Sequence, residues 1–178
     1  GNDAASDADG GWNTDYFEID RTKQYRTSVW VRKDTSEANS GTFYLGTQCV
    51  DNLSNGTFNS NPYFMSIRMD QTTPDMVSGE WYLMVGYIHP SGTAIGTQDD
   101  GGVYDRNGRK IYDGNTFRWT SSGDLSIHGV NPDTSQQRAY SYYDPATGAR
   151  PFWYGPRFEP MEVGTPTLQQ LLNTPSSD

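Results

Sequence analysis

Three carboxylates lie within one short segment that also contains two glycines. Asp99, Asp100 and Asp105 all fall within the eight residues Gln98–Asp105. Calcium takes six to eight oxygen ligands, and glycine lets backbone carbonyls turn toward the same ion as the carboxylates. The spacing differs from that of an EF-hand loop. The segment predicts a calcium site at Asp99, Asp100 and Asp105, with a polar loop of solvated acids as the alternative.

Residues for nucleophilic or acid–base catalysis are sparse. The two histidines are His89, which ends an apolar segment, and His128, which lies in no known motif. No Gly-x-Ser-x-Gly sequence is present to mark a nucleophile. Glycoside hydrolysis needs two carboxylates flanking one bond, and nothing in the spacing of the Glu residues selects a pair. The sequence predicts a protein that is not an enzyme, with a carbohydrate-active hydrolase or lyase, or its accessory domain, as the alternative.

Aromatic residues and arginines predict a binding site instead. Sugars stack their C–H faces on aromatic rings, so aromatics near strand ends or loops are the informative ones. Arg138 and Arg157 flank aromatic strands and could hold a carboxylate or an acidic sugar. The favoured alternative is a structural role, with each Arg paired to Asp and stacked on Tyr inside the fold. The candidate ligand-binding residues are His89, Tyr104, Trp153, Trp119 and Tyr63.

Charge and length exclude several classes of protein. The 178 residues carry 13 basic and 22 acidic side chains, for a net charge of −9. This argues against nucleic acid or anionic lipid as a partner, because both need a basic surface. No apolar run approaches the ~18 residues of a membrane span. The single Cys49 excludes an internal disulfide, and its alternation with Phe43 and Leu45 predicts a buried thiol.

Period-two alternation of apolar and polar residues indicates β-strands. Strands are expected at Tyr25–Arg32, Thr42–Val50, Tyr63–Met69, Trp81–Ile88, Gly102–Tyr104, Arg109–Tyr112, Phe117–Trp119, Arg138–Tyr143 and Phe152–Glu159. The only helix expected is Thr167–Leu172, which Thr167 and Gln170 can cap. The acidic segment 1–11 is expected to be flexible, and 12–178 to form one domain. The fold class is all-β: an antiparallel, jelly-roll-like β-sandwich with one short C-terminal helix.

Several segments occur in an order that resembles a known group of proteins. They are Tyr16–Asp20, Tyr25–Val31, Glu80–Gly92, Gly102–Asp105, Arg138–Asp144 and Phe152–Arg157. Together they resemble the jelly-roll ligand-binding modules of large calcium-dependent bacterial adhesins and phage tail fibres, over roughly residues 12–172. The resemblance implies non-catalytic, calcium-dependent binding of a cell-surface glycan or peptide. It also implies an extracellular place, on a cell or virion surface, within a larger multidomain protein.

Overall fold

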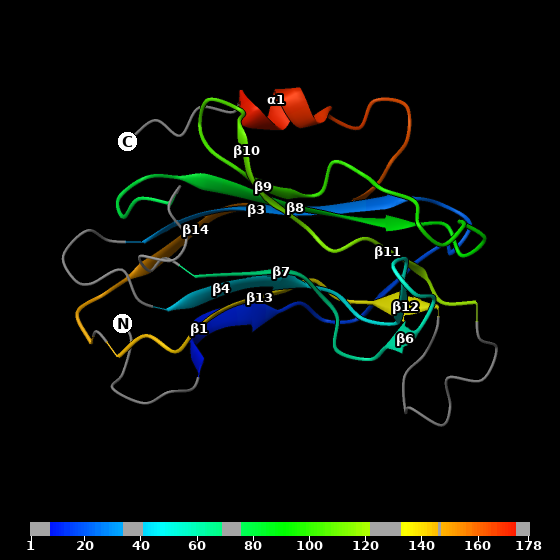
Figure 1. The fold of residues 1–178 in the computed structure, drawn as a ribbon, viewed down its shortest axis with the longest axis horizontal. Helices are drawn as coiled ribbons and strands as arrows, with labels where there is room; N and C mark the ends of the chain where they lie inside the picture. The colour runs from blue at the N-terminus through cyan, green and yellow to red at the C-terminus, as the bar shows by residue number, and fades with distance from the viewer. Residues whose placement is uncertain (1–7, 34–40, 69–75, 122–132, 146, 174–178) are drawn as a thin grey trace.

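The chain folds into two β-sheets that pack face to face, with a short helix on the outer side of one sheet (Figure 1). This computed structural model describes residues 8–33, 41–68, 76–121, 133–145 and 147–173. The elements are β1 (Ala8–Asn13), β2 (Phe17–Glu18), β3 (Tyr25–Lys33), β4 (Thr42–Gly46), β5 (Val50–Asn52), β6 (Phe58–Asn59), β7 (Tyr63–Arg68), β8 (Tyr82–His89), β9 (Gly102–Tyr104), β10 (Lys110–Asp113), β11 (Phe117–Trp119), β12 (Thr134–Ser135), β13 (Arg138–Tyr142), β14 (Pro151–Pro160) and α1 (Leu168–Leu172).

The smaller sheet has the strand order β1-β13-β4-β7, and all its pairings are antiparallel. In the larger sheet β3 lies between β14 and β8, and the far edge of β8 is shared by β9 and β11. The β8–β11 pairing is parallel, so this sheet is mixed. A third, two-stranded sheet joins β2 to β12. This architecture confirms the expected all-β sandwich with one short C-terminal helix.

Strand β8 is an almost unbroken apolar run because both of its faces are buried. Tyr82, Met84 and Ile88 point into the core between the sheets, whereas Leu83 and Val85 belong to a second cluster on the outer face. Helix α1 covers that second cluster through Leu171. A strand buried on both faces has no polar side to alternate with its apolar side.

The capping box expected for α1 is present. The Thr167 side chain accepts a hydrogen bond from the Gln170 backbone N–H at 3.2 Å, and the Thr167 N–H donates to Gln170 Oε1 at 2.7 Å. This fixes where the helix begins, because two of the N–H groups that lack partners inside the helix are satisfied. The short helix is otherwise held by burial of its leucines against the larger sheet.

The expected strand Thr42–Val50 is wrong as a single element. Its first half is β4 of the smaller sheet, and Val50 begins β5 of the larger sheet. Cys49 lies between them with φ +62°, a left-handed conformation that does not continue a strand. The chain therefore crosses between the layers here. Cys49 is buried, as expected, and burial raises the pKa of its thiol.

The expectation of a flexible segment over residues 1–11 is wrong for residues 8–11, which belong to strand β1. Residues 1–7 lie outside the described residues, but from Ala8 the chain pairs with β13. A Cβ at Gly11 would lie 2.0 Å from the Ala139 carbonyl oxygen, so glycine is required for the two strands to approach. Trp12 anchors the strand by packing edge-on against Trp153, with ring centres 5.2 Å apart.

Strand β7 contains a bulge, and the extra residue of this bulge packs against the larger sheet. Leu45 pairs with Met65 and Gly46 pairs with Tyr63, which leaves Phe64 as an extra residue. Phe64 and Met65 are both buried, and the Phe64 ring packs against Gly86 in the middle of β8. A bulge places two successive side chains on one side of the strand and re-aims the next one. Tyr63 is thereby turned to the outside of the smaller sheet, although Met65 and Ile67 keep their expected inward direction.

Candidate functional site

His89, a ligand-binding candidate, and Asp99, a metal candidate, lie in direct contact where the loop after β8 leads back toward β9. His89 Nε2 lies 2.9 Å from Asp99 Oδ2, and His89 Nδ1 lies 3.4 Å from Gln24 Nε2. The other Asp99 oxygen accepts the Gly101 N–H at 2.7 Å. Both side chains are mostly buried, at 12% and 7% exposure. The pair therefore fixes the loop after β8. His128 lies outside the described residues.

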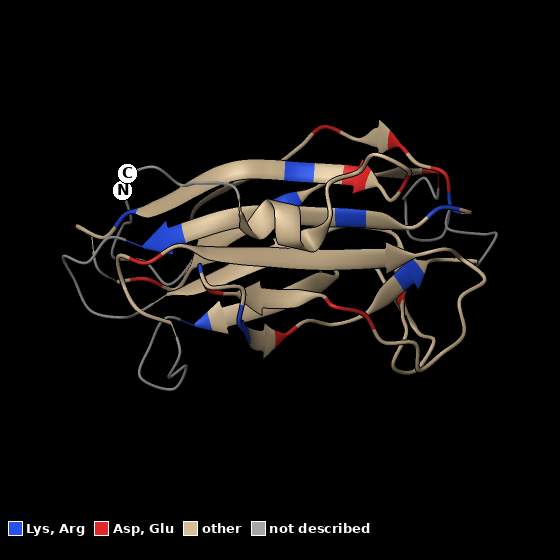
Figure 2. Cartoon of the chain, turned by 90° about the horizontal axis from the view of Figure 1, so that it is seen from above, with Lys and Arg blue, Asp and Glu red and all other residues tan. Residues whose placement is uncertain are grey.

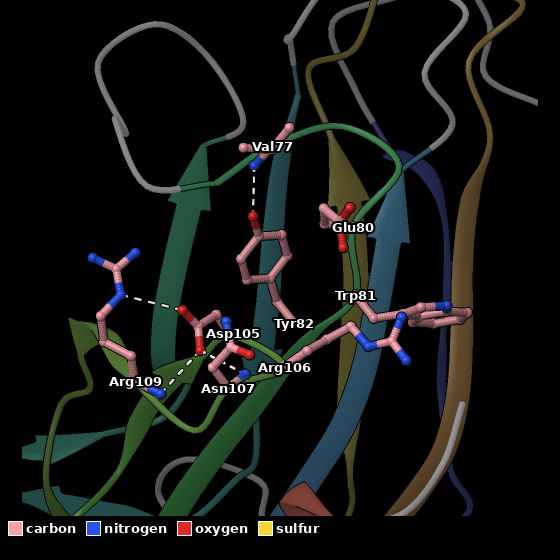
Figure 3. Close-up of a pocket in the computed structure, with 8 residues that line it drawn as sticks. All are labelled: Val77, Glu80, Trp81, Tyr82, Asp105, Arg106, Asn107 and Arg109. Atoms are coloured by element: carbon pink, nitrogen blue, oxygen red, sulfur yellow. Dashed lines mark hydrogen bonds and ion pairs between the residues drawn. The ribbon is translucent and has the colours of Figure 1, made fainter. Parts of the chain in front are cut away.

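Asp105 belongs to the turn between β9 and β10 rather than to a cluster with Asp99. Its Oδ1 accepts the Asn107 and Arg109 N–H groups at 2.9 Å, and its Oδ2 lies 3.2 Å from Arg109 Nε (Figure 3). Although partial burial raises the pKa of Asp105, these hydrogen bonds outweigh it and leave the pKa below its ordinary value. A pocket of about 230 Å³ lies beside this turn. Asp105, one of the two acids that line this pocket, is already bound by protein donors.

Asp100 is exposed, and its backbone carbonyl accepts a hydrogen bond from Tyr104 Oη at 2.5 Å. Among the residues that the structure describes, no three His, Cys, Asp or Glu side chains gather in a group that could hold a metal. For calcium to bind at Asp99, Asp100 and Asp105, the first and last would have to leave His89 and Arg109. The structure itself does not bring the three carboxylates to one point.

The aromatic candidates separate into core and surface. Trp119 is completely buried and donates from Nε1 to the Lys23 carbonyl at 3.1 Å, so it offers no face to a ligand. Tyr104 is buried, and burial raises the pKa of its phenol. Trp153 packs edge-on against Phe43 with ring centres 5.4 Å apart. Of the five ligand-binding candidates, Tyr63 is the one that lines a pocket on the outer side of a sheet.

Tyr63 belongs to a group that we call the tyrosine face, on the outer side of the smaller sheet. Its members are Tyr44 of β4, Tyr63 of β7, Tyr140 and Tyr142 of β13, and the adjoining Tyr143. Ring centres are 5.0 Å apart for Tyr44 and Tyr63, and 5.6 Å apart for Tyr44 and Tyr142. Tyr142 in turn lies 5.6 Å from Tyr140 and 5.5 Å from Tyr143. The rings form a continuous aromatic surface outside the core.

Two adjoining pockets lie on the tyrosine face. The first, which we call the Arg68 pocket, has a volume of about 290 Å³. Its lining residues are Gly41, Thr42, Tyr44, Ser66, Arg68 and Tyr143. The second, which we call the Tyr63 pocket, has about 270 Å³ and is lined by Tyr44, Asn61, Tyr63, Tyr142 and Tyr143. Tyr44 and Tyr143 line both, so they form the ridge between two neighbouring hollows.

Backbone features of the neighbouring strands hold these rings in place. A Cβ at Gly46 would lie 2.7 Å from the Tyr63 ring, so the missing side chain makes room for the ring to lie across β4. Tyr143 has φ +63°, which is costly for a residue with a large side chain. Consecutive residues of a regular strand point to opposite faces. The unusual φ instead allows Tyr142 and Tyr143 to line the same pocket.

Arg138 lies among the tyrosines. Its guanidinium carbon is 5.2 Å from the centre of the Tyr63 ring and 5.7 Å from that of Tyr140. It donates to Asn13 Oδ1 at 3.3 Å, to Asn61 Oδ1, and to Tyr63 Oη at 3.2 Å. Arg157 instead pairs with Glu159 at 3.0 Å. Stacking of Arg138 on Tyr was expected, but it occurs on the outer surface and with neutral hydrogen-bond acceptors.

Two phenols of this surface, those of Tyr44 and Tyr63, stay neutral over the physiological pH range. Burial raises the pKa of Tyr44, with a further contribution from Tyr143. Burial also raises the pKa of Tyr63 and outweighs the opposite effect of the Arg138 charge. A neutral phenol both donates and accepts hydrogen bonds. The surface can thus offer apolar rings together with hydroxyl groups, which is the pairing of groups that a sugar also presents.

The sequence contained a signal for this surface that the candidate residues did not use. In β13 the positions that alternate toward the core are the small residues Ala139 and Ser141, while Arg138, Tyr140 and Tyr142 take the other face. Large aromatics opposite small inward residues indicate a ring-bearing outer face. Tyr44 and Tyr143 carry no comparable signal. The role of Tyr44 depends on the register of β4 with β7 and β13, and that of Tyr143 depends on its φ angle.

The helix found among the described residues is too short to cross a membrane. No protein-family model, curated protein or solved structure matches the chain. The function is therefore inferred from the residues and contacts described above.

Proposed function

We propose that this protein is a non-catalytic glycan-binding module whose binding surface is the tyrosine face. The observation that carries the proposal is a connected set of partly exposed tyrosine rings around two pockets, outside the core in which aromatics such as Phe43, Phe64 and Trp119 are buried. Binding sites for small ligands combine aromatic lining with a few fixed polar groups. Arg138, Asn13 and Asn61 supply such groups here, already ordered by their mutual hydrogen bonds.

Rigidity of the surface supports this reading over a flexible peptide-binding loop. The rings come mainly from paired strands, and Tyr63 is fixed by the bulge and by Gly46. A surface that is already ordered loses little conformational entropy on binding. Flat rings on a sheet also suit the flat C–H faces of pyranose sugars. The adhesin or tail-fibre role, with its place on a cell or virion surface, is part of the same proposal and is supported by the sequence resemblance.

A glycan array probed with the purified protein tests the proposal. We expect binding to a restricted set of glycans, which Tyr44→Ala and Tyr142→Ala each weaken by about tenfold or more, the loss typical of a central aromatic contact. Tyr154→Ala is the matched control, because Tyr154 is a half-exposed tyrosine of the larger sheet. Equal binding by all four proteins would remove the tyrosine face as the site. Binding to a peptide library but to no glycan would replace the ligand class.

The absence of catalysis is tested separately. Incubation with a panel of polysaccharides and glycosides should release no reducing ends or unsaturated products. Product formation that Glu18→Gln or Glu80→Gln abolishes would instead establish an enzyme.

A further inference from the structure

The smaller sheet is cationic within a strongly acidic chain. Its four strands contain two basic residues, Arg68 and Arg138, and one acidic residue, Asp9, a local charge of +1 against −9 for the whole chain. Among the described residues, no acid lines either pocket of the tyrosine face. Figure 2, which views the chain from the side of α1, shows most Asp and Glu segments in connections and at strand ends. The four strands that carry the tyrosine face thus have a net charge opposite in sign to that of the chain.

Arg138 differs from many arginines of this protein in its partners. Five arginines pair with carboxylates: Arg21 with Asp133, Arg26 with Glu159, Arg109 with Asp105, Arg118 with Asp51, and Arg157 with Glu159. Among the described residues, by contrast, Arg138 donates to the neutral oxygens of Asn13, Asn61 and Tyr63. Its positive charge has no carboxylate against it there.

The Arg138 fork is also already oriented. Three of the five N–H groups of a guanidinium make the hydrogen bonds named above, and the Tyr63 and Tyr140 rings lie within 6 Å of its carbon. Two N–H groups are left for a ligand. Planar guanidinium groups bind carboxylates and other oxyanions with two parallel hydrogen bonds, and pre-ordering lowers the entropy lost in forming them.

Each pocket has its own arginine. Arg68 lines the Arg68 pocket, and Arg138 bonds to Asn61 and Tyr63, which line the Tyr63 pocket. The pockets adjoin across the ridge of Tyr44 and Tyr143. A ligand that fills both is longer than one sugar ring, and it places an anionic group near each end.

We infer that the ligand of the tyrosine face is an anionic oligosaccharide of at least two sugar units, held by Arg68 and Arg138 through its acidic groups and by Tyr44 and Tyr142 through its rings. This inference rests on the proposed glycan-binding function. Carboxylates of uronic acids and sulfate esters share the chemistry that an arginine fork recognises.

Calorimetric titration with matched sugars tests the inference. The probes are digalacturonic and trigalacturonic acid, the methyl esters of both, a sulfated galactan disaccharide, and the neutral galactobiose. We expect the acids or the sulfated sugar to bind at least tenfold more tightly than the neutral and esterified sugars. Comparison of the carboxylated with the sulfated probe identifies the anionic group. Affinity for the anionic sugar should also fall as salt is raised from 50 to about 300 mM, because salt screens the attraction.

Substitutions of the two arginines test whether they bind the acidic groups of the ligand. Arg138→Met and Arg68→Met should each reduce the affinity for the anionic sugar at least tenfold, and the affinity for the neutral sugar by a smaller factor. Arg138→Lys keeps the charge but loses the fork, and it should retain part of the affinity. Arg32→Met is the control, because Arg32 stacks between Trp81 and Phe152 on the larger sheet. Melting curves identify any variant that fails to fold, and Arg138→Lys then decides the outcome.

Different results would overturn the inference of an anionic ligand and the proposed glycan-binding function. Equal affinity for anionic and neutral sugars, unchanged by Arg138→Met, would overturn the inference and leave glycan binding standing. Tight binding of the single sugar galacturonic acid, with no gain for the dimer, would overturn the requirement for two units. If the wild-type protein bound none of the sugars, charged or neutral, the proposed function itself would be overturned.

Discussion

The Phe64 ring of the smaller sheet packs directly on Gly86 of the larger sheet, and a Cβ at Gly86 would lie 2.2 Å from it. This contact joins the core to the tyrosine face, because the same bulge that buries Phe64 turns Tyr63 outward. The packing between the layers therefore decides how one edge of the candidate site is built.

Gly86→Ala should destabilise the protein by about 1–3 kcal/mol, since an added methyl group in a close-packed core forces neighbouring groups to move. Urea unfolding measures the change. Gly92→Ala is the control, because nothing lies within 4 Å of a Cβ at Gly92, and it should change stability by less than about 0.5 kcal/mol. Equal stability of the two variants would show that the packing of the Phe64 ring does not require glycine at position 86.

Lys33 and Asp144 form a buried ion pair, with Nζ and Oδ2 2.6 Å apart and side-chain exposures of 2% and 1%. Lys33→Met should lower the free energy of unfolding by about 3–5 kcal/mol, because it leaves a buried carboxylate without its counter-charge. The matched control is Lys110→Met, which removes an exposed pair with Asp113 and should be nearly neutral. If the two variants unfolded at the same denaturant concentration, the Lys33–Asp144 pair would not have the stabilising role expected of it.

Tyr143→Gly separates stability from binding. Glycine relieves the cost of φ +63°, and Tyr143 is 52% exposed, so little packing is lost. We expect the free energy of unfolding to change by no more than about 1 kcal/mol while glycan affinity falls by about tenfold or more. Thermal unfolding and titration of one glycan give the two values. Lost stability with unchanged affinity would make Tyr143 a structural residue.

Alkaline pH should destabilise the fold through phenols that are buried or half-buried. Burial raises the pKa of Tyr44, Tyr63 and Tyr104 above the ordinary value of about 10. Below pH 10 these phenols are neutral in both the folded and the unfolded state, so pH has no effect through them. Above pH 10 they ionise more readily in the unfolded chain, and the free energy of unfolding falls.

Tyrosinate absorbance followed during a pH titration checks this expectation. Part of the 12 tyrosines should ionise only well above pH 10 in the folded protein, and all should ionise near 10 in denaturant. A single transition near 10 in the folded protein would contradict it.

Calcium binding at Gln98–Asp105 stays a prediction from the sequence. An ion that binds only the folded state stabilises it by about 2.7 kcal/mol at a hundredfold excess over Kd, which raises Tm by several degrees. Asp105→Asn should abolish the increase. Identical melting curves with calcium and with chelator, for a sample shown to be free of metal, would contradict the predicted calcium site.

The sequence by itself determined the fold class and most of the elements. Alternation located β3, β7 and β13, and the Thr167 and Gln170 capping box located α1, because these signals are local and are carried by consecutive residues. Burial of Cys49 was also predicted, but from a single strand that does not form, because Cys49 lies where the chain crosses between the sheets. The pairing of His89 with Asp99, by contrast, was not predicted and is visible only in the tertiary structure.

Only the tertiary structure decided which aromatics face outward. Trp119 and Tyr63 look alike in sequence, but the first is enclosed between the layers and the second is turned out by a bulge whose extra residue fills the space above Gly86. Asp99 and Asp105 are close in sequence, yet one bonds to a histidine and the other closes a hairpin. Strand pairing brings Tyr44, Tyr63 and Tyr142 together from three separate segments. No local pattern encodes that register, because it is set by contacts between residues far apart in the chain.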